Sequence, residues 1–210
     1  SFGTATLTGE GILSTLLNQA RVVLTALSHA IEAKDPFTRG HSVRVSVIAE
    51  VIARRLGWKS SRLDALRLGG QLHDVGKLNL DGAVLHKAGP LDERERLHVR
   101  GHPLAGARLI RPFAALHPAL PYVLFHHERW DGTGYPTGRA HEQIPSGARI
   151  LAVADAFDAM ISHRPYRHAL PFYRALAEVR GCAGTQFDPA VVRAFLAAWA
   201  EGHFDEIRAA

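Results

Sequence analysis

The chain has 210 residues, 47% hydrophobic and 21% charged, which is enough apolar material for one packed domain and argues against disorder. Its single cysteine, Cys182, excludes an internal disulfide and a thiolate metal site, and it suits a reducing compartment. The net charge of +5 comes from dispersed cations, so we expect no DNA or RNA partner; such a field suits a small phosphate-bearing substrate.

The chain also lacks the features of a membrane or secreted protein. No apolar run reaches the roughly 20 residues that span a bilayer, so membrane insertion is not expected. Residues 1–10 lack the basic and then apolar pattern of a secretory signal. We therefore expect a cytoplasmic protein.

Helical periodicity dominates the first part of the chain. Apolar residues recur at helical spacing over 11–34, and Asp35, which precedes a proline, ends that helix. A second helix is predicted over 41–56, where Gly57 ends it. No alternating strand pattern and no internal repeat interrupts the helices, so the fold class is all-α.

The middle of the chain predicts shorter elements. Ser61 with Asp64 resembles a capping box that opens a third helix, which ends near His73. A loop is expected over 80–89, and the next helix is expected over 102–110.

A long loop separates these helices from the last ones. It covers 127–147, and loops longer than about 12–15 residues are more often functional than incidental. Ser146 is expected to cap an apolar helix that reaches residue 161. Asp188 and Pro189 are expected to start the last helix as its N-cap and first residue.

Seven residues scattered between positions 41 and 155 form a candidate site for two metal ions. They are His41, His73, Asp74, His102, His126, His127 and Asp155. Imidazole nitrogens and carboxylate oxygens are ligands that Fe, Mn, Zn and Ni accept. One carboxylate can bridge two ions, and a binuclear centre is a known device for displacement at phosphorus.

The adjacent pair His73–Asp74 can reach one ion only at a helix end, which Gly76 supplies. The two glycines at 69–70 would let another helix approach closely. A lone His-Asp pair is a weak signal. Lys77 suits an ion pair with Asp74 or a contact with phosphate, and an ordinary surface ion pair is the alternative.

Other candidates carry alternatives of their own. His126 and His127 follow an apolar run, where a metal explains two buried imidazoles, and a polar pair at a helix end is the alternative. Asp155 lies in an otherwise apolar helix and needs a cation. Asp158, one turn later, is a rival ligand or a partner that orients an imidazole.

His41 and His102 each open a helix after a glycine, and for each alone a polar cap is the alternative. The eight histidines outside the candidate site have no comparable setting, and we expect them on the surface.

Five motifs occur in order along the chain. They are HDVGK (73–77), HHERWDGTGYP (126–136), IPSGARILAVADAFDAM (144–160), RPYR (164–167) and GTQFDP (184–189). Together they resemble HD-GYP domains, the bacterial cyclic di-GMP phosphodiesterase branch of the HD metallohydrolase superfamily. The resemblance covers roughly 26–200 and implies a helical bundle with extra C-terminal helices and an N-terminal connector helix.

The resemblance also implies roles for single residues. One metal ion would be held by His41, His73, Asp74 and Asp155. The other would be held by Asp74, His102, His126 and His127, so that Asp74 bridges the two. Catalytic roles fall to Asp74 and Lys77, and substrate contacts fall to Gly134, Tyr135, Pro136, Arg164 and Arg167. The two arginines also suit these contacts by their chemistry, because a guanidinium can fork onto phosphate or stack on a base.

Departures from the family pattern refine this expectation. Some members bind a third metal through an acidic residue where this chain has Phe37, so we expect two divalent transition metal ions. By analogy these are Fe or Mn, with Zn, Ni and Co as alternatives. His163 and Asp81 also depart from the common pattern, but neither is a predicted metal ligand.

The resemblance implies hydrolysis of cyclic di-GMP to pGpG, and in some members on to GMP. One alternative is a low-activity or inactive module that senses cyclic di-GMP or docks onto a partner such as a GGDEF-type synthase. Another is an HD hydrolase of a different nucleotide phosphoester.

We expect three segments. They are a tail with a connector helix over 1–34, the HD-GYP metallohydrolase domain over 35–201, and a C-terminal tail over 202–210. The connector helix would follow a sensory domain, and its apolar face would pair with a second copy in a homodimer. Packing of this helix on its own domain is the alternative.

Overall fold

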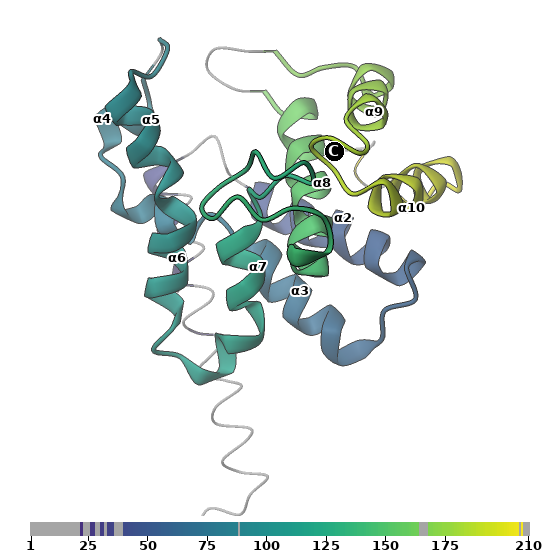
Figure 1. Ribbon diagram of the computed structural model, residues 1–210, viewed down its shortest axis with the longest axis horizontal. Helices are drawn as coiled ribbons and strands as arrows, with labels where there is room; N and C mark the ends of the chain where they lie inside the picture. The colour runs from purple at the N-terminus through teal and green to yellow at the C-terminus, as the bar shows by residue number, and fades with distance from the viewer. Residues whose placement is uncertain are drawn as a thin grey trace, which may run out of the picture.

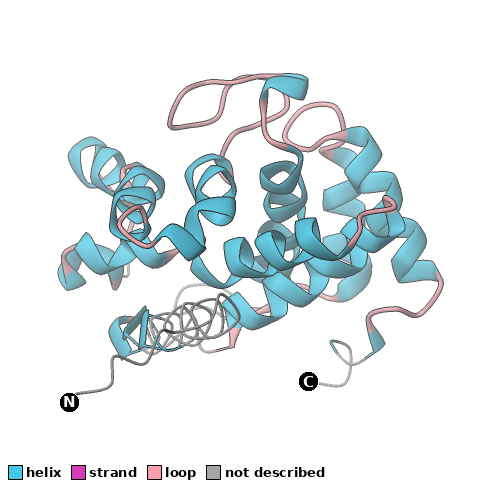
Figure 2. Ribbon diagram, turned by 90° about the horizontal axis from the view of Figure 1, so that it is seen from below, coloured by secondary structure: helices cyan, strands magenta, loops and turns pink. Residues whose placement is uncertain are grey.

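The computed structural model describes residues 22, 26–27, 30–31, 33–35, 40–87, 89–163, 168–205 and 207. Over these residues the chain forms helices and no strand, with one isolated bridge between Ala183 and Phe187. The all-α prediction is confirmed (Figure 2). In the described part of the chain, no helix has the length and apolar character that a bilayer crossing requires.

Nine α-helices and three short 3-10 helices lie between residues 41 and 200, and Figure 1 labels the α-helices. The α-helices are α2 (His41–Arg55), α3 (Ser60–Leu72), α4 (Gly82–Leu85), α5 (Glu93–Arg100), α6 (His102–Ile110), α7 (Leu120–Phe125), α8 (Ser146–Ile161), α9 (Phe172–Gly181) and α10 (Pro189–Ala200). The 3-10 helices are η2 (Val75–Asn79), η3 (Ala114–Ala119) and η4 (His141–Gln143). Helices α4 and α5 lie at one end of the molecule, and α9 and α10 lie at the other.

Three apolar clusters hold these helices together, and the third is a small one of Phe125, Ile144 and Ala148. The other two join most of the helices. The larger one joins α2, α3, α8, α9 and α10, and in it the ring of Phe157 lies 4.8 Å from that of Phe195. The smaller one joins the ends of α3 and α6 to η2, η3 and α7 through side chains such as Leu72, Ile110 and Val123. The predicted metal ligands lie on helices of both clusters, so apolar packing sets the distances between them.

The described residues before Asp35 are helical, as the periodicity predicted. Ile31 is 3% exposed and packs into the smaller cluster, and the Lys34 ammonium donates a hydrogen bond to the Leu78 carbonyl (2.6 Å). At these positions the helix therefore packs on its own domain. Most of 1–34 lies outside the described residues, and the predicted dimer and the domain boundaries stay predictions.

Two predicted helix caps are wrong. At the start of α3 the extended residue is Lys59, so the helix begins before Ser61, and Asp64 pairs with Arg67 instead (2.7 Å). At the start of α8 the residue outside the helix is Pro145, which leaves Ser146 inside the first turn. A cap must adopt an extended backbone, and the tertiary path of the chain gives that conformation to the preceding residue in both cases.

Three helices were not predicted. Helix α4 occupies part of the expected loop, and α5 and α9 lie in segments for which no helix was expected. Helix α5 has no buried residue, so the apolar period that signals a helix is absent, and a capping box between Asp92 and Glu95 marks its start. The predicted start of α10 is confirmed, because the Asp188 carboxylate accepts from the Ala190 amide (2.8 Å).

Candidate metal centre

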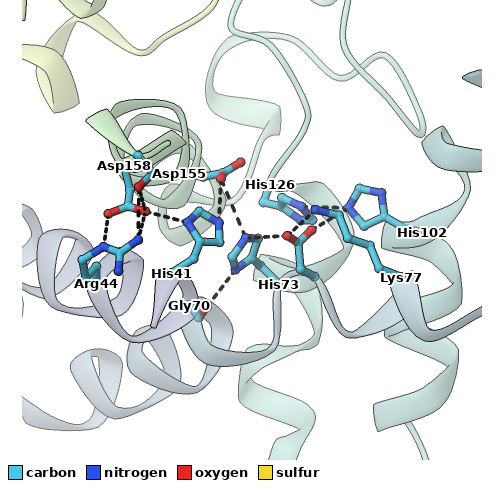
Figure 3. A network of polar contacts seen from close by, with 11 residues as sticks. His41, Arg44, Gly70, His73, Lys77, His102, His126, Asp155 and Asp158 are labelled. Carbon is cyan, nitrogen blue, oxygen red and sulfur yellow. Dashed lines mark hydrogen bonds and ion pairs between the residues drawn. The ribbon is translucent and has the colours of Figure 1, made fainter. Parts of the chain in front are cut away.

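Helix ends bring the predicted ligands together (Figure 3). His41 and His102 are the first residues of α2 and α6. His73 and His126 directly follow α3 and α7. Asp155 differs, because it lies within α8. At a helix end, successive side chains can turn toward one point, which explains how the adjacent His73 and Asp74 both reach the centre.

Two glycines let the backbones approach closely enough for this convergence. A Cβ atom on Gly76 would lie 1.9 Å from the carbonyl oxygen of His102, so η2 rests directly on the start of α6. A Cβ atom on Gly70 would lie 2.8 Å from the Cα atom of Ser46, so α3 rests directly on α2. The close approach predicted at 69–70 is therefore observed, and the contact at Gly76 adds to it.

The seven side chains form two adjoining groups. One group contains Asp74, His102, His126 and His127, and the other contains His41, His73 and Asp155. Within each group the candidate ligand atoms all lie within 4.8 Å of one another. Bonds of about 2.0–2.2 Å place opposite ligands of one ion about 4 Å apart, so this spacing is close to that of a shared ion.

Asp74 stands between the two groups. Its Oδ1 atom lies 3.3 Å from Nε2 of His102, and its Oδ2 atom lies 3.4 Å from Nε2 of His73. The Lys77 ammonium lies 2.5 Å from Oδ2. This ion pair is not the ordinary surface pair considered above, because Asp74 is buried and Lys77 is mostly covered.

Backbone carbonyl groups fix the orientation of three imidazoles. The Nδ1 atoms of His73, His102 and His126 each donate to the carbonyl oxygen three residues earlier, at 2.7, 2.8 and 2.7 Å. A carbonyl oxygen carries no proton, so Nδ1 must supply it. In the neutral ring the Nε2 atom then presents its lone pair to the centre.

A carboxylate orients the fourth imidazole. Nδ1 of His41 lies 2.7 Å from Oδ2 of Asp158, and Nε2 of His41 lies 3.2 Å from Asp155. The guanidinium of Arg44 holds Asp158 in turn, with Nε 2.7 Å from Oδ1. Asp158 is therefore a partner that orients His41, which was one of the two roles considered for it. The imidazole ring of His41 lies between Asp158 and Asp155.

The donor set fits metal ions. Nε2 of His73 is buried and has no hydrogen-bond partner in the described part of the chain. The Nε2 atoms of His102 and His126 lie 3.2 Å apart, and two lone pairs this close repel each other. A bound cation would give the buried His73 nitrogen a partner and would remove the repulsion between the other two nitrogens. Nitrogen and carboxylate oxygen together are ligands that suit a transition metal. This His/Asp cluster is compatible with metal binding.

Three members of the cluster already have the protonation states that metal binding requires. Burial opposes ionisation of Asp74, yet Lys77 and the surrounding imidazoles hold the pKa of its carboxyl well below the usual range. Burial also opposes ionisation of Asp155, whose pKa is lowered by the hydrogen bond from His41. Burial and neighbouring imidazoles lower the pKa of His126, so this ring stays neutral. Both carboxylates are thus anionic and His126 is neutral, which are the states that bind metal.

The GYP segment folds back onto the histidine pair. The ring of Tyr135 stacks on that of His127, with centroids 4.8 Å apart and planes at 27°. A Cβ atom on Gly134 would lie 2.3 Å from the amide nitrogen of Arg129, so only glycine fits there. Pro136 follows Tyr135 through a cis peptide bond. Gly134, Tyr135 and Pro136 therefore lie beside the centre.

Some predicted features lie outside the described residues. These are Phe37, Arg164 and Arg167. The histidines expected on the surface are exposed wherever the structure describes them. Arg44 was not predicted, although its position one turn after His41 on the same helix is a signal that could have found it.

Comparison with protein families identifies the kind of domain that the chain forms. The model of the HD domain family matches residues 25–191. The chain belongs to the HD domain family. This membership confirms the resemblance that the five motifs indicated.

Curated relatives of this HD domain are cyclic dinucleotide enzymes by name. The 3'3'-cGAMP-specific phosphodiesterase 3 of Vibrio cholerae is 38% identical over 167 residues, which cover 80% of this chain and 36% of the relative. The cyclic di-GMP phosphodiesterase response regulator RpfG of Xanthomonas campestris is 39% identical, over 84% of this chain and 47% of the relative. The cyclic di-GMP phosphodiesterase PA4108 of Pseudomonas aeruginosa is 41% identical, over 80% of this chain and 41% of the relative. The chain thus spans less than half the length of these relatives.

Solved structures share the fold. The crystal structure of V-cGAP3 from Vibrio cholerae has a TM-score of 0.67 at 20% identity, over 87% of this chain and 49% of that one. Bd1817, an HD-GYP-type protein from Bdellovibrio bacteriovorus, has a TM-score of 0.61 at 21% identity, over 74% of this chain and 50% of that one. At these identities the likeness establishes the helical HD fold.

Proposed function

We propose that this HD domain hydrolyses a phosphodiester bond of cyclic di-GMP and releases linear pGpG. The observation that carries the proposal is the pair of adjoining ligand groups with Asp74 between them. Membership of the HD family and the names of the curated relatives support the substrate class. A second cut to GMP is a further step of the same chemistry.

The ligand sets proposed for the two ions follow the two groups. One ion takes His41, His73, Asp74 and Asp155, and the other takes Asp74, His102, His126 and His127. Fe or Mn is proposed, with Zn, Ni and Co as alternatives, since all-nitrogen and oxygen ligation suits each of them. When bound, such a pair supplies Lewis-acid chemistry, because it activates water and neutralises charge on the phosphate.

Side chains around the centre position the substrate and balance charge. Lys77 keeps Asp74 anionic, and its ammonium lies close enough to the centre to offset charge that grows on the phosphate oxygens. Tyr135, held on His127, offers an aromatic face to the substrate beside the centre. Arg164 and Arg167 are proposed as cations for phosphate and guanine, which rests on the family resemblance.

A second substrate is supported by one observation. A relative 38% identical to this chain is named a 3'3'-cGAMP-specific phosphodiesterase, so 3'3'-cGAMP is a candidate beside cyclic di-GMP. Incubation of metal-loaded protein with each dinucleotide, followed by chromatography of the products, tests both. Elemental analysis of the same sample gives the identity and number of the metals. Stoichiometric retention of intact dinucleotide would favour the sensing alternative.

Asp158 provides a test of the proposed ligand His41. In Asp158→Asn the carboxylate that accepts from His41 becomes an amide, and we expect metal affinity at the His41 group to fall about 10–100-fold. Affinity at the His102 group should stay unchanged. Competition with a chromophoric chelator measures both. Ser162→Ala is the matched control, because it removes a side chain that contacts Arg44 and Asp158 but leaves the His41–Asp158 hydrogen bond intact.

Metal binding should also release a proton from His41. Burial opposes its ionisation, but hydrogen bonds with Asp155 and Asp158 raise its pKa to about 9 in the metal-free protein. His127 contributes none, because burial lowers its pKa to about 3. Metal affinity should therefore rise with pH up to about 9, with about one proton released from His41 at neutral pH. Calorimetry in buffers of different ionisation enthalpy measures the release.

The raised pKa of His41 also predicts how the stability of the metal-free protein depends on pH. The pKa of His41 is higher in the folded chain than its ordinary value of 6.5. The stability it contributes is therefore fully present below pH 6.5 and is lost as the pH rises through about 9. Proton release that is absent at neutral pH would contradict both expectations.

The surroundings of this domain in the cell are also proposals. A sensory domain before the connector helix, a GGDEF-type partner, a homodimer through that helix and a cytoplasmic location all fit a domain that acts on a second messenger. Sedimentation of the chain with and without residues 1–30 tests the dimer.

A further inference from the structure

Arg100 lies beside the candidate centre without belonging to either ligand group. It is the last residue of α5, two positions before His102. Its guanidinium carbon lies 5.4 Å from the centre of the Tyr135 ring, and that ring stacks on His127. This cation and a proposed metal ligand therefore contact the same aromatic ring.

The centre is partly exposed at His127, the ligand on which Tyr135 stacks. His127 and Asp155 are partly exposed, whereas His73, His102 and His126 are buried. A substrate must reach the centre past the two exposed members. Tyr135 stacks on His127, and Arg100 lies over the Tyr135 ring, so both residues lie next to this partly exposed member.

The guanidinium of Arg100 is available to an anion. The structure gives it no carboxylate partner within the described ranges, and its side chain is exposed. Two cations near the centre already form ion pairs, Lys77 with Asp74 and Arg44 with Asp158. A guanidinium is always charged and its planar donors match phosphate oxygens.

We propose that Arg100 binds the second phosphate of a cyclic dinucleotide, the one that is not being hydrolysed. The inference rests on the proposed function. The two phosphates of such a substrate lie on opposite sides of one macrocycle, so only one of them can occupy the centre. The other must lie at the entrance, where a cation offsets its charge. Arg100 is thus a substrate-binding residue that selects for dinucleotides over simple phosphodiesters.

The test compares Arg100→Ala with Arg96→Ala, a matched loss of one exposed arginine from the same helix. For cyclic di-GMP, we expect R100A to raise KM about 10–100-fold with little change in kcat, as for loss of a charged hydrogen bond. For bis(p-nitrophenyl) phosphate, which has one phosphate, kcat/KM should change less than about twofold. R96A should match the wild type on both substrates, and R100K should recover part of the loss.

Three outcomes would overturn the inference. Equal losses on both substrates would show that Arg100 acts only by supporting Tyr135. An equal effect of R96A would show that net charge alone is responsible. An unchanged KM in R100A with unchanged metal content would show that the side chain does not contact the substrate.

Binding measurements separate this inference from the proposed function. If the wild type binds cyclic di-GMP without hydrolysing it, the proposed hydrolysis fails, and the ratio of Kd values for R100A and wild type still decides the role of Arg100. If the wild type neither binds nor hydrolyses a cyclic dinucleotide, both proposals fall together. Calorimetry with the metal-loaded protein provides the Kd values.

Discussion

Replacement of Asp74 by alanine is expected to abolish metal binding and phosphodiester hydrolysis together. Asp74 is the only carboxylate of the cluster that approaches imidazoles of both groups in the described structure, at 3.3 Å from His102 and 3.4 Å from His73. Its loss removes an anionic ligand from each proposed ion. Turnover should fall at least about a thousandfold, since a metal pair supplies several kcal/mol and each 1.4 kcal/mol is tenfold.

Two further variants sharpen this experiment. Asp74→Asn keeps the shape of the side chain but offers one neutral oxygen, so at most one ion should remain bound. Asp64→Ala removes one carboxylate from an exposed pair with Arg67, and it should keep both metals and full activity. Elemental analysis, product chromatography and far-UV circular dichroism are measured on all three. Two tightly bound ions in D74A, or turnover within tenfold of wild type, would refute the bridging role.

Replacement of Gly76 by alanine should have the second large effect, through packing alone. The added methyl group would lie 1.9 Å from the His102 carbonyl oxygen and 2.5 Å from the Gly106 amide nitrogen, both of them backbone atoms of α6. Backbone atoms cannot rotate away as a flexible side chain can, so α6 must move from η2. We expect a loss of about 1–3 kcal/mol or more in the free energy of unfolding, as for other overpacked sites.

The same displacement should reach the metal centre. Movement of α6 separates His102 from Asp74, so the metal affinity of the His102 group should fall while the His41 group keeps its ion. Urea unfolding is measured in the presence of a chelator, because bound metal would add to the apparent stability. Chelator competition then measures each affinity.

Gly181→Ala provides the control for Gly76→Ala. Gly181 ends α9, and an added Cβ atom there meets nothing within 4 Å. Alanine should therefore leave the stability unchanged or raise it by up to about 1 kcal/mol. Equal unfolding free energies for G76A and the wild type, together with unchanged metal affinities, would show that η2 and α6 are not in contact as described.

The amino-acid sequence predicted much of the fold by periodicity. Helices over 41–56 and 102–110 and the start of the last helix at Asp188 agree with α2, α6 and α10. Helix α5 could not be found in the same way, because it buries no side chain and so has no apolar period. The capping predictions at Ser61 and Ser146 failed because cap position depends on where the incoming chain is extended, which neighbouring helices decide.

By itself, the sequence determined which side chains can form the centre. The chemistry of a ligand belongs to the residue type, and short motifs such as HDVGK fix which candidates are neighbours along the chain. Only the tertiary structure decided how these groups face one another. The two oxygens of Asp74, the support of His41 by Asp158 and Arg44, and the place of Arg100 over Tyr135 each depend on distances between residues remote in sequence. Those distances are set by helix packing, and a packing contact such as Gly76 against His102 leaves no local pattern from which it could be predicted.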